Sequence, residues 1–120
     1  MNDCIFCRIA TGEIPATLVH ADERVIAFRD LNPQAPVHVL VVPRRHVGSL
    51  AELAADDDGE DAQLAAALLA VARRVARAEG LTDPERGFRL VANSGPDGGQ
   101  SVGHLHFHVL GGRVLAWPPG

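Results

Sequence analysis

Three of the chain's six histidines, His104, His106 and His108, alternate with apolar residues in segment 104–110. Because successive side chains of a strand point to opposite faces, this pattern predicts a strand with its three imidazoles on one face, roughly 6.6–6.8 Å apart. Each ring can act near neutral pH as a nucleophile, a proton carrier, a metal ligand or a donor to phosphate. We interpret the segment as a reactive or binding site; a solvated, histidine-rich face is the alternative.

The segment before these histidines, residues 93–103, contains four glycines. Glycine lets a backbone approach a ligand closely and turn its amide groups toward phosphate oxygens, although such loops are also plain turns. Asn93, Gln100 and Ser101 add neutral donors. A neutral imidazole attacks phosphorus well when the proton on its other nitrogen has an acceptor. Beside three histidines on one face, the loop therefore favours phosphate chemistry.

Composition limits the class of protein. The 120 residues suit one domain, 1–120, and the 47% apolar fraction is typical of a globular protein. A net charge of −4 and a pI near 5.8 argue against a nucleic-acid partner. No apolar run approaches the roughly 20 residues that span a bilayer, and the polar start Met1-Asn2-Asp3 does not resemble a signal peptide. We expect a cytoplasmic protein without a membrane partner.

Periodicity predicts a short helix over 4–10 and a long helix that Gly80 ends, with an apolar stripe of Leu64, Leu68, Val71 and Val75. We expect the acidic run Asp56-Asp57-Asp58 to cap this long helix rather than to bind a metal. The predicted strands are 18–20, 25–28, 37–42, 88–91 and 104–110. This order predicts an α+β fold: a five-stranded antiparallel sheet with one long helix and a short N-terminal helix.

Both cysteines lie in a single Cys4-Ile5-Phe6-Cys7 unit. In a reducing compartment this spacing indicates a metal or redox pair before a structural disulfide. It is half of a tetrahedral zinc site, which needs two further ligands. A pair of buried thiols that pack as small hydrophobes is the alternative.

The segment 104–110 fits the pattern His-φ-His-φ-His-φ-φ, where φ is apolar. Further blocks in the same order resemble those of the nucleotide-binding, phosphoramidase branch of the histidine triad (HIT) family. These blocks are 5–6, 12–15, 30–38, 43–46, 97–102, 111–113 and 117–120. One position departs from the family: Gly103 stands where members often carry an aromatic residue, which puts the leaving-group preference in doubt.

The resemblance implies a homodimeric, HIT-like α+β protein that binds purine nucleoside phosphates of the AMP or GMP type and cleaves nucleoside 5′-phosphoramidates. By the motif match, His106 is the nucleophile that attacks the α-phosphorus and forms a nucleotidyl-histidine. His108 would donate to the α-phosphate, His104 completes the triad, and His38 would lie behind it. His38 could equally be a satisfied buried histidine.

The resemblance also assigns residues to the substrate. Asp30 would accept the ribose hydroxyls, because a carboxylate accepts two hydrogen bonds at once, and its alternative role is that of a turn residue. Trp117 would reach the site of the partner subunit, or serve only as an interface anchor. The phosphate and leaving group would contact Asn93, Gly99, Gln100, Ser101 and Val102. The base would contact Phe6, Ile9, Ile14, Phe28 and Leu31, several of which would be plain core residues in most proteins.

Some bacterial histidine-triad proteins and the related uridylyltransferases hold zinc with two cysteines and two histidines. The matching residues here are Cys4, Cys7, His46 and His104. The resemblance therefore implies one structural zinc per chain and no catalytic cofactor. Two competing functions stay open: a metallohydrolase whose strand histidines bind a catalytic ion, and a nucleotide-binding interaction protein whose hydrolysis is incidental.

Overall fold

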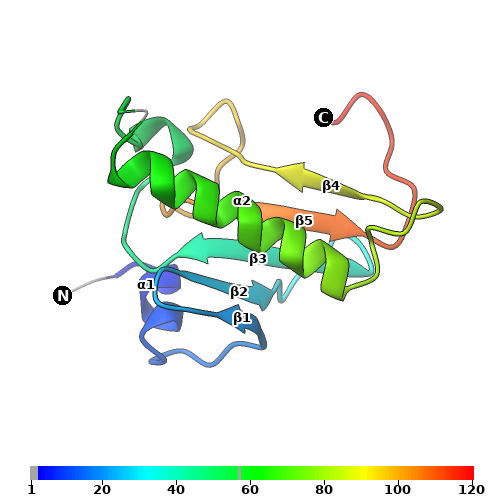
Figure 1. The fold of residues 1–120 in the computed structure, drawn as a ribbon, viewed down its shortest axis with the longest axis horizontal. Coiled ribbons are helices and arrows are strands. Elements are labelled where there is room, and N and C mark those ends of the chain that lie inside the picture. The colour runs from blue at the N-terminus through cyan, green and yellow to red at the C-terminus, as the bar shows by residue number, and fades with distance from the viewer. Residues whose placement is uncertain (1–2, 57) are drawn as a thin grey trace.

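A five-stranded antiparallel sheet forms the centre of the structure, a computed structural model that describes residues 3–56 and 58–120 (Figure 1). The strands lie in the order β1-β2-β3-β5-β4. They are β1 (Leu18–Ala21), β2 (Val25–Arg29), β3 (Val37–Pro43), β4 (Phe88–Val91) and β5 (Phe107–Gly111). The helices are α1 (Ile5–Ala10), the 3-10 turn η1 (Leu50–Glu52) and α2 (Glu60–Ala78). The predicted α+β class and the number of strands are confirmed.

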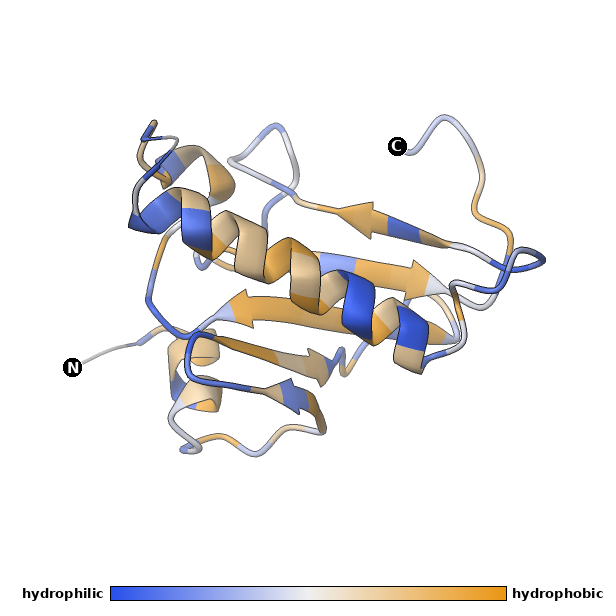
Figure 2. Ribbon diagram, viewed as in Figure 1, coloured by the Kyte–Doolittle hydropathy of each residue, from blue (hydrophilic) through white to orange (hydrophobic). Residues whose placement is uncertain are grey.

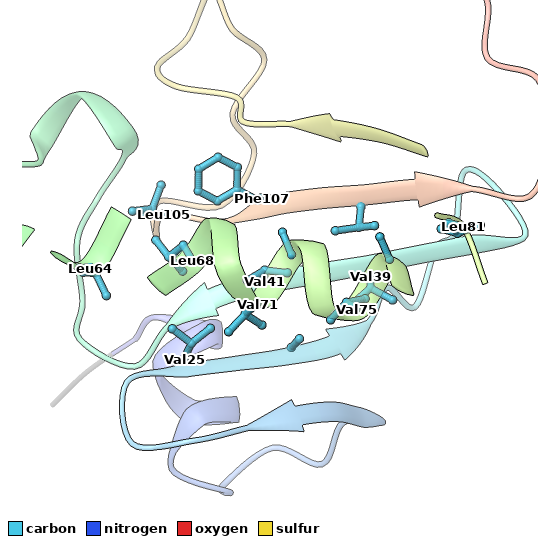
Figure 3. Packing of buried hydrophobic residues seen from close by; sticks show 14 of the residues in the cluster. Val25, Val39, Val41, Leu64, Leu68, Val71, Val75, Leu81, Leu105 and Phe107 are labelled. Atoms are coloured by element: carbon cyan, nitrogen blue, oxygen red, sulfur yellow. The ribbon is translucent and has the colours of Figure 1, made fainter. Parts of the chain in front are cut away.

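Helix α2 covers one face of the sheet, and its predicted apolar stripe supplies the contacts (Figure 3). Leu64, Leu68, Val71 and Val75 are all buried there. Burying a side chain of this size contributes about 1.5–3 kcal/mol. The sheet side chains that pack against them include Val25, Ala27, Val39, Val41, Leu105, Phe107 and Val109.

The opposite face of the sheet packs against the short helix α1. Its apolar cluster is centred on Phe6 of α1 and includes Ile26, Phe28, Leu40 and Val42. Strand β3 is therefore buried on both faces, which explains why it is apolar along nearly its whole length (Figure 2). The histidines that could do chemistry lie on this same α1 face, beyond the apolar cluster.

The predicted cap of the long helix is wrong. Helix α2 begins one residue after Gly59, which is its N-cap and makes no side-chain cap bond. Asp56 instead accepts the amide of Asp58 at 3.2 Å, in the loop before the helix, and the predicted Asp57 lies outside the described residues. The acidic residues of the first turn, which the helix dipole favours, include Asp61.

The last strand is also shorter than predicted, because β5 starts at Phe107 rather than at His104. The amide of Leu105 donates to the carbonyl of Val47 at 2.7 Å, so this residue joins the loop after β3 instead of the sheet ladder. The alternation of faces nevertheless holds, since Leu105 and Phe107 both lie in the α2-facing core. Among the described residues, no helix has the length and apolar character that crossing a membrane requires.

Candidate active site

Strands β3 and β5 bring His38 and His108 together on the α1 face. Their register pairs Leu40 with His108 and His38 with Leu110, so the two histidines are diagonal neighbours. Diagonal neighbours on one face of an antiparallel pair lie within reach of long side chains. Here His38 Nε2 lies 2.8 Å from His108 Nδ1. The sheet register thus joins a triad histidine to one that lies 70 residues earlier.

The hydrogen bonds determine which nitrogen of each ring carries the proton. The amide of Gln34 donates to His38 Nδ1 at 3.0 Å, so the proton of a neutral His38 lies on Nε2. That proton is donated to His108 Nδ1, which leaves the proton of His108 on its Nε2. His108 Nε2 is the one buried side-chain nitrogen or oxygen without a hydrogen-bond partner in residues 3–56 and 58–120. A buried donor without a partner is costly, so it marks a place for a ligand acceptor.

Burial keeps both histidines neutral. Burial is the main reason that the pKa of His108 falls to about 4, and the neighbouring His106 and His38 lower it further against the opposing charge of Asp30. The pKa of His38 is also lowered, again by burial, while Asp30 opposes this shift. The Asp30 carboxylate lies 3.4 Å from His38 Nε2. Near neutral pH, His108 therefore offers an N–H group without carrying a full positive charge.

In His106 the proton lies on Nδ1, whereas in His108 it lies on Nε2. The Nδ1 atom of His106 lies 2.7 Å from the backbone carbonyl of His104, and since a carbonyl only accepts, Nδ1 carries the proton. The other nitrogen, Nε2, then holds the lone pair of a neutral imidazole, which is the nucleophilic form. The ring centroid lies 4.9 Å from that of His108. A nucleophilic nitrogen and an N–H donor thus belong to adjacent rings.

Cys4, Cys7, His46 and His104 converge, and their ligand atoms all lie within 4.8 Å of one another. Cys4 Sγ is 3.2 Å and Cys7 Sγ is 3.5 Å from His104 Nδ1, while the Nδ1 atoms of the two histidines are 3.1 Å apart. Tetrahedral zinc with ordinary bond lengths separates its ligands by about 3.3–3.7 Å. His104 Nε2 donates to the carbonyl of Pro43 at 2.8 Å, so Nδ1 presents its lone pair to the thiols. The donor set and its spacing fit a structural zinc ion.

Three separate segments position these four residues. Cys4 is the N-cap of α1 and its Sγ accepts the amide of Cys7 at 3.4 Å, which brings the two thiols to the same end of this helix. His46 follows β3, and His104 precedes β5. The first triad histidine, His104, therefore belongs to this Cys/His group as well as to the triad.

The glycine-rich loop is held by Gln100. Its side-chain oxygen accepts the amide of Gly95, and its amide nitrogen donates to the carbonyls of Gly48 and Val102 at 2.7 and 2.9 Å. Because both amide protons are used, Gln100 holds the loop here and has no spare donor for the phosphate that its sequence position predicts. Gly99 adopts the left-handed φ of 78° that the turn requires.

The other predicted phosphate residues differ in exposure. Asn93 is half-buried and Ser101 is exposed. Val102 packs against the apolar cluster of the α1 face, so it supports the loop from beneath. At Gly103, an added Cβ would meet no atom within 4 Å apart from its two chain neighbours, so a side chain there would have open space.

The predicted base-binding residues are only partly brought together. Phe6 and Phe28 stack edge-on with ring centroids 5.5 Å apart, and Ile9 packs beside them. Ile14 is half-buried, whereas Leu31 is 97% exposed. Phe6 and Phe28 are therefore core residues as well as predicted walls of the base site. The exposed Leu31 lies outside this core, so it could contact a base only from the surface.

Asp30 and Trp117 lie at different places. The Asp30 carboxylate accepts the amide of Asn32 at 2.8 Å and is only partly buried, so its second oxygen faces His38 at the edge of the site. Trp117 is 80% exposed, with the guanidinium of Arg89 on β4 5.9 Å from its ring centre. The C-terminal segment runs along the β4 side of the sheet, away from α1 (Figure 1). Trp117 is therefore not part of the histidine cluster of its own chain.

Several functional groups were missed because they belong to the backbone. The amide of Gln34 and the carbonyls of Pro43 and His104 each determine the tautomer of one histidine. Every residue carries such groups, so residue type gives no signal for them. Only the arrangement of the folded chain identifies them.

Comparisons with known proteins agree with this geometry. The HIT domain family model matches residues 11–115. The chain is 50% identical over 119 residues to an uncharacterized HIT-like protein of Synechococcus elongatus. The aligned residues cover 99% of this chain and 98% of the relative. It is 50% identical over 116 residues to a 14 kDa zinc-binding protein of Zea mays, over 97% of this chain and 87% of that protein. The solved structure of a HIT family hydrolase from Legionella pneumophila superposes with a TM-score of 0.89 at 47% identity, covering 98% and 100% of the two chains.

Proposed function

Because the chain belongs to the HIT domain family, we propose that residues 1–120 act as one domain that hydrolyses purine nucleoside 5′-phosphoramidates through a nucleotidyl-histidine on His106. The similarity to a HIT family hydrolase supports hydrolysis as the reaction class. The observation that carries the proposal is the pairing of two adjacent rings. His106 offers a lone pair on Nε2, and His108 offers a buried N–H that lacks a partner.

The proposed reaction has two displacements at phosphorus. His106 Nε2 attacks the α-phosphorus, the bond from phosphorus to the amine nitrogen breaks, and the amine leaves with a proton taken from solvent. Water then attacks the phosphorus, the bond from phosphorus to His106 Nε2 breaks, a proton of the water passes to solvent, and the nucleoside monophosphate is released. The His104 carbonyl stabilises the charge that develops on the His106 ring, and His108 Nε2–H donates to a phosphate oxygen.

Trapping the intermediate tests this mechanism. Adenosine 5′-phosphoramidate is mixed with the protein, the reaction is quenched rapidly with base because a phosphorylated imidazole is labile in acid, and the peptides are analysed by mass spectrometry. The expected adduct is one adenylyl group on His106. An adduct on His38 or His108, with His106 unmodified, would contradict the assignment of the nucleophile.

The geometry gives less support to a metallohydrolase. Asp30, His38 and His108 do bring ligand atoms within 4.8 Å of one another. However, His38 and His108 direct the facing nitrogens at each other in a 2.8 Å hydrogen bond, and His106 directs Nδ1 at a carbonyl. His104 directs its Nδ1 at Cys4 and Cys7 instead, so the three triad rings are not grouped around one ion. Turnover that survives dialysis against a chelator supports the covalent mechanism, whereas turnover restored only by added metal supports the metallohydrolase.

An interaction protein with incidental hydrolysis would use the same residues. The same assay separates it from an enzyme, since such a protein would bind AMP but would not turn over the phosphoramidate. We favour the enzyme because the lone pair of His106 Nε2 and the His108 donor are arranged for a reaction and not for binding alone. Binding of AMP alone requires no nucleophilic lone pair.

We also propose that Cys4, Cys7, His46 and His104 hold one structural zinc ion per chain. Their spacing supports this, as does the zinc-binding name of the Zea mays relative. Zinc, when bound, would fasten α1 to the start of β5 and supply no reactive group. Purified protein is expected to contain about one zinc per chain by elemental analysis, and Cys4→Ser is expected to lose it and to lower Tm. Metal-free protein from a zinc-supplemented preparation, with both thiols reduced, would contradict this site.

A second copy of the chain is the proposed partner at the β4 edge. This strand ends the sheet, and an unpaired edge favours pairing with another strand. Its residues Phe88 and Leu90 are 41% and 36% exposed, and Val114 and Trp117 beside it are 93% and 80% exposed. A homodimer would cover this surface and allow Trp117 to reach the partner's site. Sedimentation equilibrium of the wild type, with Leu90→Arg as the disrupting variant, tests the assembly.

A further inference from the structure

His104 belongs to the proposed metal site and also contacts the proposed nucleophile, His106. His104 directs its ring Nδ1 toward Cys4 and Cys7, and its backbone carbonyl accepts the Nδ1 proton of His106 at 2.7 Å. Its other ring nitrogen donates to the carbonyl of Pro43. With metal bound, both nitrogens of the His104 ring would have fixed partners. The position of the carbonyl that orients His106 would then depend on the metal.

A second connection passes through helix α1. Phe6 lies between the two cysteines in the sequence, and only 5% of it is exposed. Its ring meets the His106 ring edge-on, with centroids 5.1 Å apart and planes at 86°. It also meets the His104 ring at 5.9 Å. The helix that carries both thiols thus places an aromatic wall against the nucleophile.

Helix α1 depends on tertiary contacts for its order: Phe6, Ile9 and Ala10 lie in or against the apolar cluster of the α1 face, and the guanidinium of Arg44 donates to the carbonyl of Ala10 at 2.8 Å. It has six residues, which is far shorter than an isolated helix needs for stability in water. Its buried residues are Phe6 and Cys7. A metal ion that joins Cys4 and Cys7 to His46 and His104 would add to these contacts and order the segment further.

We infer that metal binding at the Cys4–Cys7–His46–His104 cluster and nucleotide binding at His106 are thermodynamically linked, with Phe6 and the His104 carbonyl as the connection. A nucleotide that binds the metal-loaded protein finds α1 already ordered, so it loses less conformational entropy on binding. Linkage is reciprocal, so the nucleotide must tighten metal binding by the same factor. The inference rests on the proposed nucleotide site, and its positioning residues are Phe6 and His104.

Two affinities measure the linkage without any turnover. AMP binding is measured by calorimetry with zinc-loaded and metal-free protein, the latter dialysed against a chelator under reducing conditions. Zinc affinity is measured by competition with a chromophoric chelator, with and without saturating AMP. We expect metal to tighten AMP binding, and AMP to tighten zinc binding, each by about tenfold. Hydrogen exchange of the α1 amides is expected to slow when either ligand binds.

A matched pair of variants on α1 tests the route. Phe6→Leu keeps an apolar side chain but removes the ring edge that meets His106, so the reciprocal factor is expected to fall toward one while zinc still binds. Ile5→Ala changes the neighbouring residue, which is 47% exposed, and is expected to keep the full factor. The zinc affinities with and without AMP are measured from the zinc-loaded protein, so this comparison of Phe6→Leu with Ile5→Ala can still be made if the metal-free chain unfolds.

The outcomes separate this inference from the proposed function. If AMP binds the zinc-loaded and metal-free proteins equally, the linkage is overturned and the nucleotide site stands. If Phe6→Leu keeps the full factor, the route through Phe6 is overturned. If zinc-loaded protein binds no AMP, the nucleotide site is overturned and the linkage with it. Reciprocal factors that agree, and that Phe6→Leu alone reduces, support the linkage.

Discussion

On the α2 face of the sheet, the helix and the strands meet through an apolar cluster. On the α1 face, the apolar cluster is smaller, and the buried polar residues His38, His104 and His106 lie beside it. The first face depends on burial, which is proportional to area and has no direction. The second depends on hydrogen bonds, each of which needs a particular donor and acceptor. The comparison indicates that the α2 face mainly stabilises the fold, while the α1 face carries the polar groups to which we assign the proposed chemistry.

The largest expected effect is on the α1 face. His106→Ala removes the proposed nucleophile, so turnover of adenosine 5′-phosphoramidate is expected to fall at least about a thousandfold, or about 4 kcal/mol of barrier. The variant is expected to stay folded because the apolar clusters stay intact, with a lowered Tm because the buried His106 ring leaves a cavity beside Phe6. Initial rates and thermal unfolding measure both quantities. His20→Ala, on β1, is the control that should keep activity, and near-normal turnover by folded His106→Ala would refute covalent catalysis.

The matching change on the α2 face should affect stability instead. Leu68 is fully buried, so Leu68→Ala is expected to cost about 2–5 kcal/mol of unfolding free energy, because it leaves a cavity. The neighbouring Leu69 is 50% exposed, so Leu69→Ala should stay within about 0.5 kcal/mol. Urea unfolding compares the two variants. A large loss of turnover per folded molecule in Leu68→Ala would break the division between the faces.

Acid should destabilise the whole fold through the buried histidines of the α1 face. The pKa of His108 is about 4 in the folded protein and about 6.5 in an unfolded chain, so the unfolded chain binds more protons between these values. Unfolding free energy should therefore fall as the pH drops from about 6.5 to 4, by up to about 1.4 kcal/mol per pH unit for this group. The lowered pKa of His38 acts in the same direction. Urea unfolding at several pH values measures the slope, which should be shallower in His108→Asn; an equal slope would assign the effect to other groups.

The smallest effect concerns ribose. Asp30→Asn is expected to weaken AMP binding by about three- to tenfold, or about 0.7–1.4 kcal/mol, because a neutral amide is a poorer acceptor for the two hydroxyls. Binding of the 2′-deoxy analogue, which offers one hydroxyl fewer, should weaken less. Calorimetry with the two ligands makes the comparison. Equal losses would indicate that Asp30 serves only the turn at Asn32 and the contact with His38.

Local patterns predicted the elements well. The apolar stripe of α2 and the alternation of histidines with apolar residues in segment 104–110 depend on neighbours a few residues apart. Both are present in the structure. The errors lie at element ends. Asp56 was predicted to cap α2, and His104 to begin the last strand, but a backbone bond from Leu105 to Val47 delays β5 until Phe107. Ends depend on partners that are distant in the sequence.

The sequence by itself determined the α+β order and the placing of histidines on one face, because these follow from the periods of strands and helices. It also shows the Cys4-x-x-Cys7 spacing directly. The resemblance to a family named the ligand set, but only the fold brought Cys4 and Cys7 to His104, about a hundred residues away. Only the β3–β5 register joined His38 to His108. The histidine tautomers were decided by backbone groups of Gln34, Pro43 and His104. Residue type does not reveal these groups, because the position of a ring proton depends on where the folded chain places its hydrogen-bond partner.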